Sequence, residues 1–146
     1  MGSSKQILVK SLIGASYFTC DVPWACISIV TEPGTWPVIS TDHRMGLLQL
    51  AFADIGNVSG DEPKAFTEDH AHRVWDFVKA LWSDIDVLMV HCEEGNSRGP
   101  AVAAAVTRRY LGENRWYFLP HVYWPNKHVY GVLLKVAQQR GELREG

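Results

Sequence analysis

Short apolar runs and longer amphipathic segments alternate along the chain. Four of the short runs have the length of buried strands and are bounded by proline, glycine or polar residues. These predicted strands cover residues 7–10, 25–30, 47–52 and 87–90. Two longer segments repeat apolar side chains every three or four positions, which predicts amphipathic helices that begin after Thr67 and Asn126, two residues able to cap a helix.

A third helix is predicted by composition. Residues 100–111 are alanine-rich and almost wholly apolar, which suits a helix buried in the centre of the molecule, and Gly112 is a natural end for it. Residues 31–45 and 53–64 are rich in proline, glycine or small polar residues and predict loops. Residues 11–18 have no clear period and predict a loop or a short helix.

The order of these elements predicts the fold class. Strands that alternate with helices indicate an α/β fold with a central, mostly parallel sheet flanked by helices. A chain of 146 residues is long enough for one such core, so we expect a single domain over residues 5–146. Ligands of parallel sheets bind beyond the carboxyl ends of the strands, where the loops that begin at Ala53 and Cys92 should lie together.

Composition excludes several classes of partner. The net charge of -2, the pI near 6.3 and the lack of a long basic run argue against nucleic-acid binding. No apolar stretch approaches the roughly 20 residues of a membrane-spanning helix, and the N-terminus lacks a signal-peptide core, so we expect a cytoplasmic protein without membrane partners. Three cysteines without a C-x-x-C pair predict reduced thiols and no structural metal. The sequence leaves the oligomeric state open.

The stretch Val87–Gly99, VLMVHCEEGNSRG, joins a predicted strand to the start of the alanine-rich helix. Backbone N–H groups of such a loop converge at a helix N-terminus and bind anions. A cysteine becomes a good nucleophile as the thiolate, which a helix N-terminus and a nearby cation stabilise, and Cys92 is expected to have both. Arg98 offers a planar fork for two phosphate oxygens, and Gly95 lets the backbone approach the anion.

His91, Cys92, Gly95 and Arg98, as H-C-x-x-G-x-x-R, resemble the signature of the cysteine-dependent protein tyrosine phosphatases. The order of the other elements resembles the small dual-specificity-like branch over nearly the whole chain. The resemblance implies that Cys92 attacks phosphorus and forms a cysteinyl-phosphate, without metal or cofactor. It implies that His91 orients the loop and that the phosphoryl group is bound by six residues, Glu93, Glu94, Gly95, Asn96, Ser97 and Arg98.

The family also uses an aspartate that protonates the leaving oxygen and later activates water. In the family this acid follows a strand about thirty to forty residues before the cysteine. Asp54 is our candidate, with Asp61 as the alternative. Trp36-Pro37 is similar to the Trp-Pro-Asp loop of larger tyrosine phosphatases, but Val38 stands where the acid would be. Asn126 lies in a segment that resembles one of small bacterial phosphatase-like proteins, where the asparagine braces a loop, and a helix cap explains it equally well.

One residue departs from the family pattern. Gly99 stands where the family has Ser or Thr, whose hydroxyl helps the phosphoenzyme to break down, so we expect slow hydrolysis of the intermediate. Glu93 and Glu94 would repel a headgroup with many phosphates, which favours a phosphorylated protein or a small phosphomonoester. The choice between phosphotyrosine and phosphoserine or phosphothreonine stays open. The main alternative is an inactive phosphoresidue-binding module; a sulfur transferase or arsenate reductase fits the residues around Cys92 less well.

Overall fold

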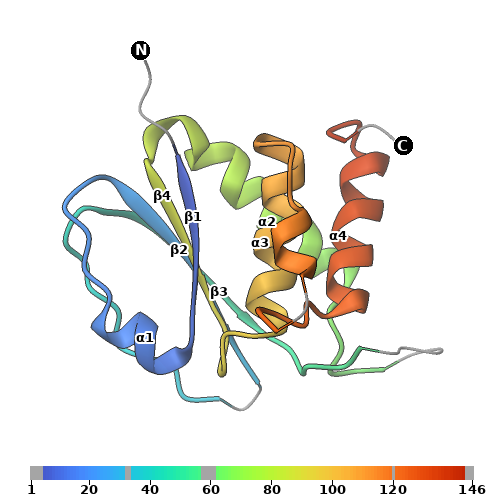
Figure 1. Cartoon of the computed structure of the whole chain (residues 1–146), viewed down its shortest axis with the longest axis horizontal. Helices are drawn as coiled ribbons and strands as arrows, with labels where there is room; N and C mark the ends of the chain where they lie inside the picture. The colour runs from blue at the N-terminus through green and yellow to red at the C-terminus, as the bar shows by residue number, and fades with distance from the viewer. Residues whose placement is uncertain (1–4, 32–33, 57–61, 120, 144–146) are drawn as a thin grey trace.

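Four parallel strands form the centre of the structure, a computed structural model that describes residues 5–31, 34–56, 62–119 and 121–143. The strands are β1 (Gln6–Lys10), β2 (Trp24–Val30), β3 (Arg44–Ala51) and β4 (Val87–His91). They lie in the order β1-β4-β2-β3, and each pair of neighbours is parallel (Figure 1). The predicted α/β fold with a parallel sheet flanked by helices is confirmed.

The apolar composition of β2 and β4 explains their central position. Every residue of both strands is buried, as expected for strands of a parallel sheet that is covered on both faces. Alternate side chains of β2 face opposite ways: Ile27 and Ile29 belong to the larger hydrophobic cluster, and Trp24 and Cys26 belong to a smaller one.

Helices cover both faces of this sheet unequally. Three of them, α2 (Glu68–Leu81), α3 (Arg98–Tyr110) and α4 (Lys127–Gln139), lie together on one side, and the short α1 (Leu12–Tyr17) lies on the other (Figure 1). Two 3₁₀ turns follow α2 and α3, at Trp82–Asp84 and Arg115–Phe118. None of the helices in the described ranges combines the length and apolar character that crossing a bilayer requires.

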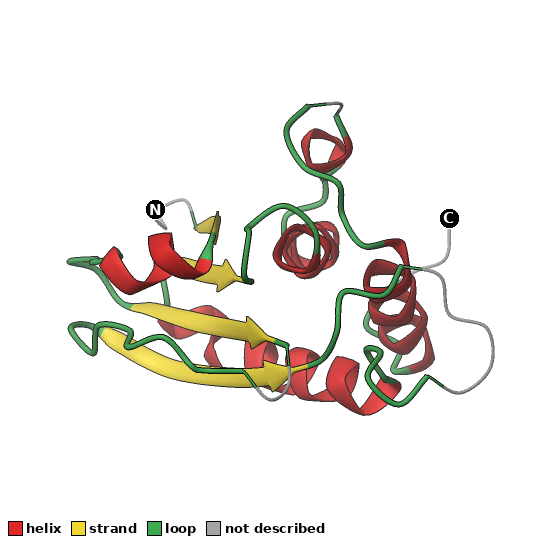
Figure 2. Cartoon of the chain, turned by 90° about the horizontal axis from the view of Figure 1, so that it is seen from below, coloured by secondary structure: helices red, strands yellow, loops and turns green. Residues whose placement is uncertain are grey.

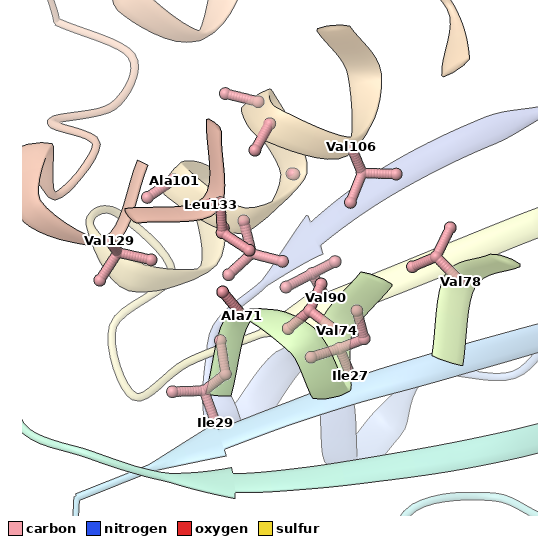
Figure 3. Packing of buried hydrophobic residues seen from close by; sticks show 14 of the residues in the cluster. Ile27, Ile29, Ala71, Val74, Val78, Val90, Ala101, Val106, Val129 and Leu133 are labelled. Atoms are coloured by element: carbon pink, nitrogen blue, oxygen red, sulfur yellow. The ribbon is translucent and has the colours of Figure 1, made fainter. Parts of the chain in front are cut away.

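The larger core fills the space between the sheet and the three helices. Figure 3 shows Ile27 and Ile29 of β2 facing Val74 of α2, with Val129 and Leu133 of α4 completing the layer. All five side chains are buried. Because α3 enters this core over most of its length, its first turn and the loop before it are fixed relative to the sheet.

The predicted helix ends are confirmed by their hydrogen bonds. The Thr67 hydroxyl accepts from the backbone N–H of His70, and His70 Nδ1 accepts from the N–H of Thr67, which forms a reciprocal cap at the start of α2. Asn126 Oδ1 accepts from the N–H of Val129 at 3.0 Å and caps α4. Gly112 has a φ of +100° directly after α3, as expected for a C-terminal glycine.

Two element starts differ from the prediction by two residues or more. β3 begins at Arg44 rather than Leu47, so the predicted loop 31–45 ends earlier than expected. Arg44 is polar and Met45 is exposed. Arg44 pairs with Trp24 of β2, and its Nη1 donates two hydrogen bonds to carbonyls of the preceding loop. α3 begins at Arg98, two residues before Pro100. Neither extension has an apolar pattern in the sequence.

Candidate active site

The loops that follow β2, β3 and β4 surround one hollow at the carboxyl edge of the sheet. Figure 2 is seen from this side, with α3 end-on behind the loop that connects it to β4. The hollow has a volume of about 260 Å³ and is lined by Thr31, Asp54, Cys92, Glu93, Glu94, Asn96, Ser97 and Arg98. The structure therefore places the predicted nucleophile, the predicted arginine and the first candidate acid around the same space.

The loop of residues 92–97, here called the Cys92 loop, rests on the turn between β1 and α1. The N–H of Cys92 donates to the carbonyl of Lys10 at 3.4 Å, and the N–H of Leu12 donates to the carbonyl of Glu93 at 3.0 Å. Gly95 has a φ of +80°, and a Cβ added there would stand 2.9 Å from the backbone nitrogen of Ser11. Both observations require glycine at this position, because any side chain would meet backbone atoms.

Cys92 lies at the base of the hollow, beside the N-terminal turn of α3. Only 2% of it is exposed, and its Sγ accepts a hydrogen bond from the N–H of Gly95 at 3.3 Å. The N-terminal end of a helix attracts negative charge. A phosphoryl group that enters the hollow would thus meet both the sulfur and the backbone donors of the loop.

Arg98 is held by three neighbours from different parts of the chain. Its Nη1 donates to the Thr31 hydroxyl at 2.9 Å and to the carbonyl of Phe52 at 2.7 Å, and its Nη2 forms an ion pair with Glu93 Oε1 at 2.8 Å. Glu93 Oε1 also accepts from the Thr31 hydroxyl at 2.5 Å. The hydrogen bonds from Thr31 and Arg98 hold the pKa of the Glu93 carboxyl below its usual range, so the side chain is a carboxylate at neutral pH.

Asp54 contacts the Cys92 loop directly. Its Oδ1 accepts from the Ser97 hydroxyl at 2.8 Å and from Asn126 Nδ2 at 2.6 Å. The backbone N–H of Asn126 donates to the carbonyl of Ser97 at 3.1 Å, so one buried asparagine joins the acid, the loop and α4. Asp61, the alternative acid, lies outside the described residues.

His91 contacts the start of the Cys92 loop from inside the core. It is fully buried, its Nδ1 is 3.2 Å from the carbonyl of Cys92, and its Nε2 is 2.5 Å from the Ser28 hydroxyl. A carbonyl can only accept, so Nδ1 carries the hydrogen and the neutral ring accepts from Ser28 at Nε2. Burial lowers the pKa of His91; the hydrogen bond to Cys92 opposes this change, and the nearby charge of Arg98 adds to it. His91 therefore has the geometry of a neutral support for the loop.

Solved structures of known proteins share the fold of this chain. Human DUSP28 is similar over 92% of this chain and 93% of its own, with a TM-score of 0.65 and 17% identity. A mouse putative dual specificity phosphatase complexed with zinc tungstate is similar over 92% of this chain and 80% of its own, with a TM-score of 0.57 and 20% identity. The human tyrosine phosphatase-like serine/threonine/tyrosine-interacting protein is similar over 81% of this chain and 78% of its own, with a TM-score of 0.55 and 20% identity.

The chain has the dual-specificity phosphatase fold. No family model and no curated protein sequence matches it. At identities of 17 to 20%, the likeness concerns the fold, and it confirms at that level the resemblance predicted from the H-C-x-x-G-x-x-R residues.

Within this dual-specificity phosphatase fold, the remaining loop residues have separate positions. Glu94 is exposed, and its Oε2 is 3.5 Å from Asn96 Nδ2. The backbone carbonyl of Asn96 accepts from the backbone N–H of Trp124, a residue that is 63% exposed. Gly99 is buried in the first turn of α3, against the sulfur of Cys92.

Two residues of the site were not predicted from the sequence. Thr31 contacts both Arg98 and Glu93, and Ser28 contacts His91. Each had a weak signal: Thr31 is the first residue after a predicted strand, and Ser28 is the one polar residue in the apolar run of β2. Polar groups at the carboxyl end of a parallel strand are candidates for a site by position alone.

The other two cysteines lie away from this chemistry. Cys26 is fully buried in the smaller hydrophobic cluster, and burial raises the pKa of its thiol to about 12 despite the nearby charge of Arg44. Cys20 is half-buried, and all three thiols are free. Cys26 therefore behaves as a small apolar side chain.

Proposed function

We propose that the chain is a cysteine-dependent phosphomonoesterase that acts on phosphorylated proteins, with phosphotyrosine as the first expectation and dual specificity as its extension. The observation that supports it is the meeting of Cys92, Arg98 and Asp54 around one hollow of about 260 Å³. A nucleophile, an anion-binding cation and an acid are the groups that this hydrolysis requires.

In the first step the Cys92 thiolate attacks phosphorus, and the bond between phosphorus and the leaving oxygen breaks. Asp54 gives its proton to that oxygen, so the alcohol or phenol leaves neutral. In the second step Asp54, now a carboxylate, takes a proton from water as the water oxygen attacks phosphorus. The sulfur–phosphorus bond breaks, which releases phosphate and restores the thiolate. Arg98 and the N–H groups of the Cys92 loop bind the phosphoryl oxygens throughout.

The experiment is the release of p-nitrophenol from p-nitrophenyl phosphate by the wild type and three variants. Cys92→Ser should show no turnover above background, because an alcohol is a far weaker nucleophile. Arg98→Lys should lose about 100-fold or more in kcat/KM, the size of effect seen for removal of an oxyanion-binding donor. Asp54→Asn should lose the basic limb of the pH profile, because a neutral amide cannot donate the proton. Full activity of Cys92→Ser would overturn the mechanism.

A phosphoresidue-binding module is the second candidate, and one observation favours it. Gly99 brings no hydroxyl to the Cys92 sulfur. Rapid mixing with substrate separates the two functions. A burst of one equivalent of p-nitrophenol followed by slow turnover indicates an enzyme limited by its intermediate, whereas tight binding of a phosphopeptide without a burst indicates a binding module.

A further inference from the structure

The ion pair between Glu93 and Arg98 lies inside the hollow that should bind phosphate. Arg98 is only 5% exposed, and its Nη2 is 2.8 Å from Glu93 Oε1. The side chain of Glu93 is 47% exposed, so the carboxylate reaches the buried guanidinium from the solvent side. An internal carboxylate thus stands where an incoming anion needs the cation.

The other contacts of Arg98 determine which of its N–H donors remain for a phosphoryl group. A guanidinium carries five N–H donors, two on each Nη and one on Nε. Both hydrogens of Nη1 have protein acceptors, the Thr31 hydroxyl and the Phe52 carbonyl. A bidentate grip on two phosphoryl oxygens must therefore use Nε together with Nη2, and Glu93 already accepts from one of the two Nη2 hydrogens.

Glu93 can leave without disturbing the rest of the site. Thr31 and Phe52 keep Arg98 in place through Nη1, and Glu93 moves toward solvent on its exposed side. The Thr31 hydroxyl, which donates to Glu93 in the free protein, then becomes available to a phosphoryl oxygen. The exchange replaces one anion by another on the same two donors, Arg98 and Thr31.

We propose that Glu93 is an internal competitor, a carboxylate with which a phosphoryl group must compete for Arg98. This inference rests on the proposed function to the extent that the hollow binds oxyanions. The same competition acts on every oxyanion that enters the hollow. An anion with no further contacts, such as inorganic phosphate, therefore binds weakly, whereas an ester gains affinity from any contacts that its organic part makes.

The test is equilibrium binding of tungstate and of inorganic phosphate, measured by titration calorimetry on the whole chain. Glu93→Gln keeps an oxygen that can accept from Arg98 and removes the charge. It should bind both anions about tenfold more tightly than the wild type, because the competing charge–charge contact is lost. Glu94→Gln is the matched control, since it removes the same charge one residue away without touching Arg98, and its gain should stay below about threefold.

Each outcome decides a separate point. Equal gains in both variants would mean that the overall charge of the hollow matters and would overturn the role of Glu93. Weaker binding by Glu93→Gln and Glu93→Ala would show that Glu93 only positions Arg98, which also overturns it. No anion binding by any of the proteins would overturn the proposed function itself. Tighter anion binding by Glu93→Gln, together with no hydrolysis of p-nitrophenyl phosphate by the wild type, would support the role of Glu93 and contradict the proposed enzymatic activity.

Discussion

Gly99 is packed against the side chain of Cys92, and a Cβ added to Gly99 would lie 3.3 Å from Cys92 Sγ. A serine hydroxyl at this position would come within reach of the sulfur after a shift of a few tenths of an ångström. A hydrogen bond to an ionised group contributes about 1.5–3 kcal/mol, so Gly99→Ser should accelerate breakdown of the cysteinyl-phosphate about tenfold. Stopped-flow measurement would show a smaller burst and a faster steady state. Gly99→Ala adds the carbon without the hydroxyl; an equal acceleration in that variant would contradict the explanation.

Asn126 couples the candidate acid to the cap of α4, and two substitutions separate these roles. Asn126→Ala removes both the bond to Asp54 and the bond to Val129, and should destabilise the fold by about 1 kcal/mol. Asn126→Ser keeps a capping oxygen but is too short to reach Asp54. Both variants should hydrolyse phenyl phosphate more slowly than the wild type and p-nitrophenyl phosphate almost as fast, because the better leaving group needs less help from an acid. Urea unfolding checks the stability, and a loss that is equal for both esters would argue against the link to Asp54.

Gly95→Ala should separate the Cys92 loop from the turn between β1 and α1 on which it rests. The φ of +80° alone costs about 1–2 kcal/mol for alanine, and the added Cβ at 2.9 Å from the Ser11 nitrogen makes the total larger. Gly112→Ala has a φ of +100° with open space around the added Cβ, and so measures the cost of the backbone conformation alone. The free energy of unfolding in urea should fall clearly more for Gly95→Ala, and tungstate binding should be lost only there.

The buried His91 predicts a pH dependence of stability with a definite sign. Burial is the main cause of the lowered pKa of His91, so below the ordinary pKa of 6.5 the unfolded chain binds a proton here that the folded protein does not. Stability should therefore fall as pH drops below about 6.5, by up to about 1.4 kcal/mol per pH unit from this group. His91→Asn should flatten the slope of stability against pH. Ser28→Ala should lower the stability at every pH and leave this slope unchanged. Urea unfolding between pH 5 and 8 measures both, and an unchanged slope in His91→Asn would reject the assignment.

The parts of the fold that follow from local chemistry could be predicted from the sequence. The caps at Thr67 and Asn126 and the strand, loop and helix around Cys92 are visible in residue types and spacing over a few positions. The start of β3 at Arg44 could not be predicted, because pairing with β2 rather than an apolar pattern extends that strand.

The contacts within the site depend on residues that are far apart in the sequence. Glu93 was expected in the phosphate-binding set, and its side chain turns instead to Arg98 because Thr31, at the end of another strand, holds both. The pairing of Asn126 with Asp54 spans 72 positions and depends on how α4 packs against α3. No local pattern encodes either contact, so sequence predicts the members of the site better than their partners.

The charges around the hollow should reverse the effect that salt usually has on phosphate binding. Among the described residues that line it, Arg98 carries positive charge, whereas Asp54, Glu93 and Glu94 are carboxylic acids. At physiological ionic strength, ions screen charges over about 8 Å, which is comparable to the width of such a site. Added electrolyte therefore weakens a net repulsion toward an approaching dianion. Most basic phosphate sites attract their ligand most strongly in dilute buffer; this acidic one should receive it faster as the buffer becomes more concentrated.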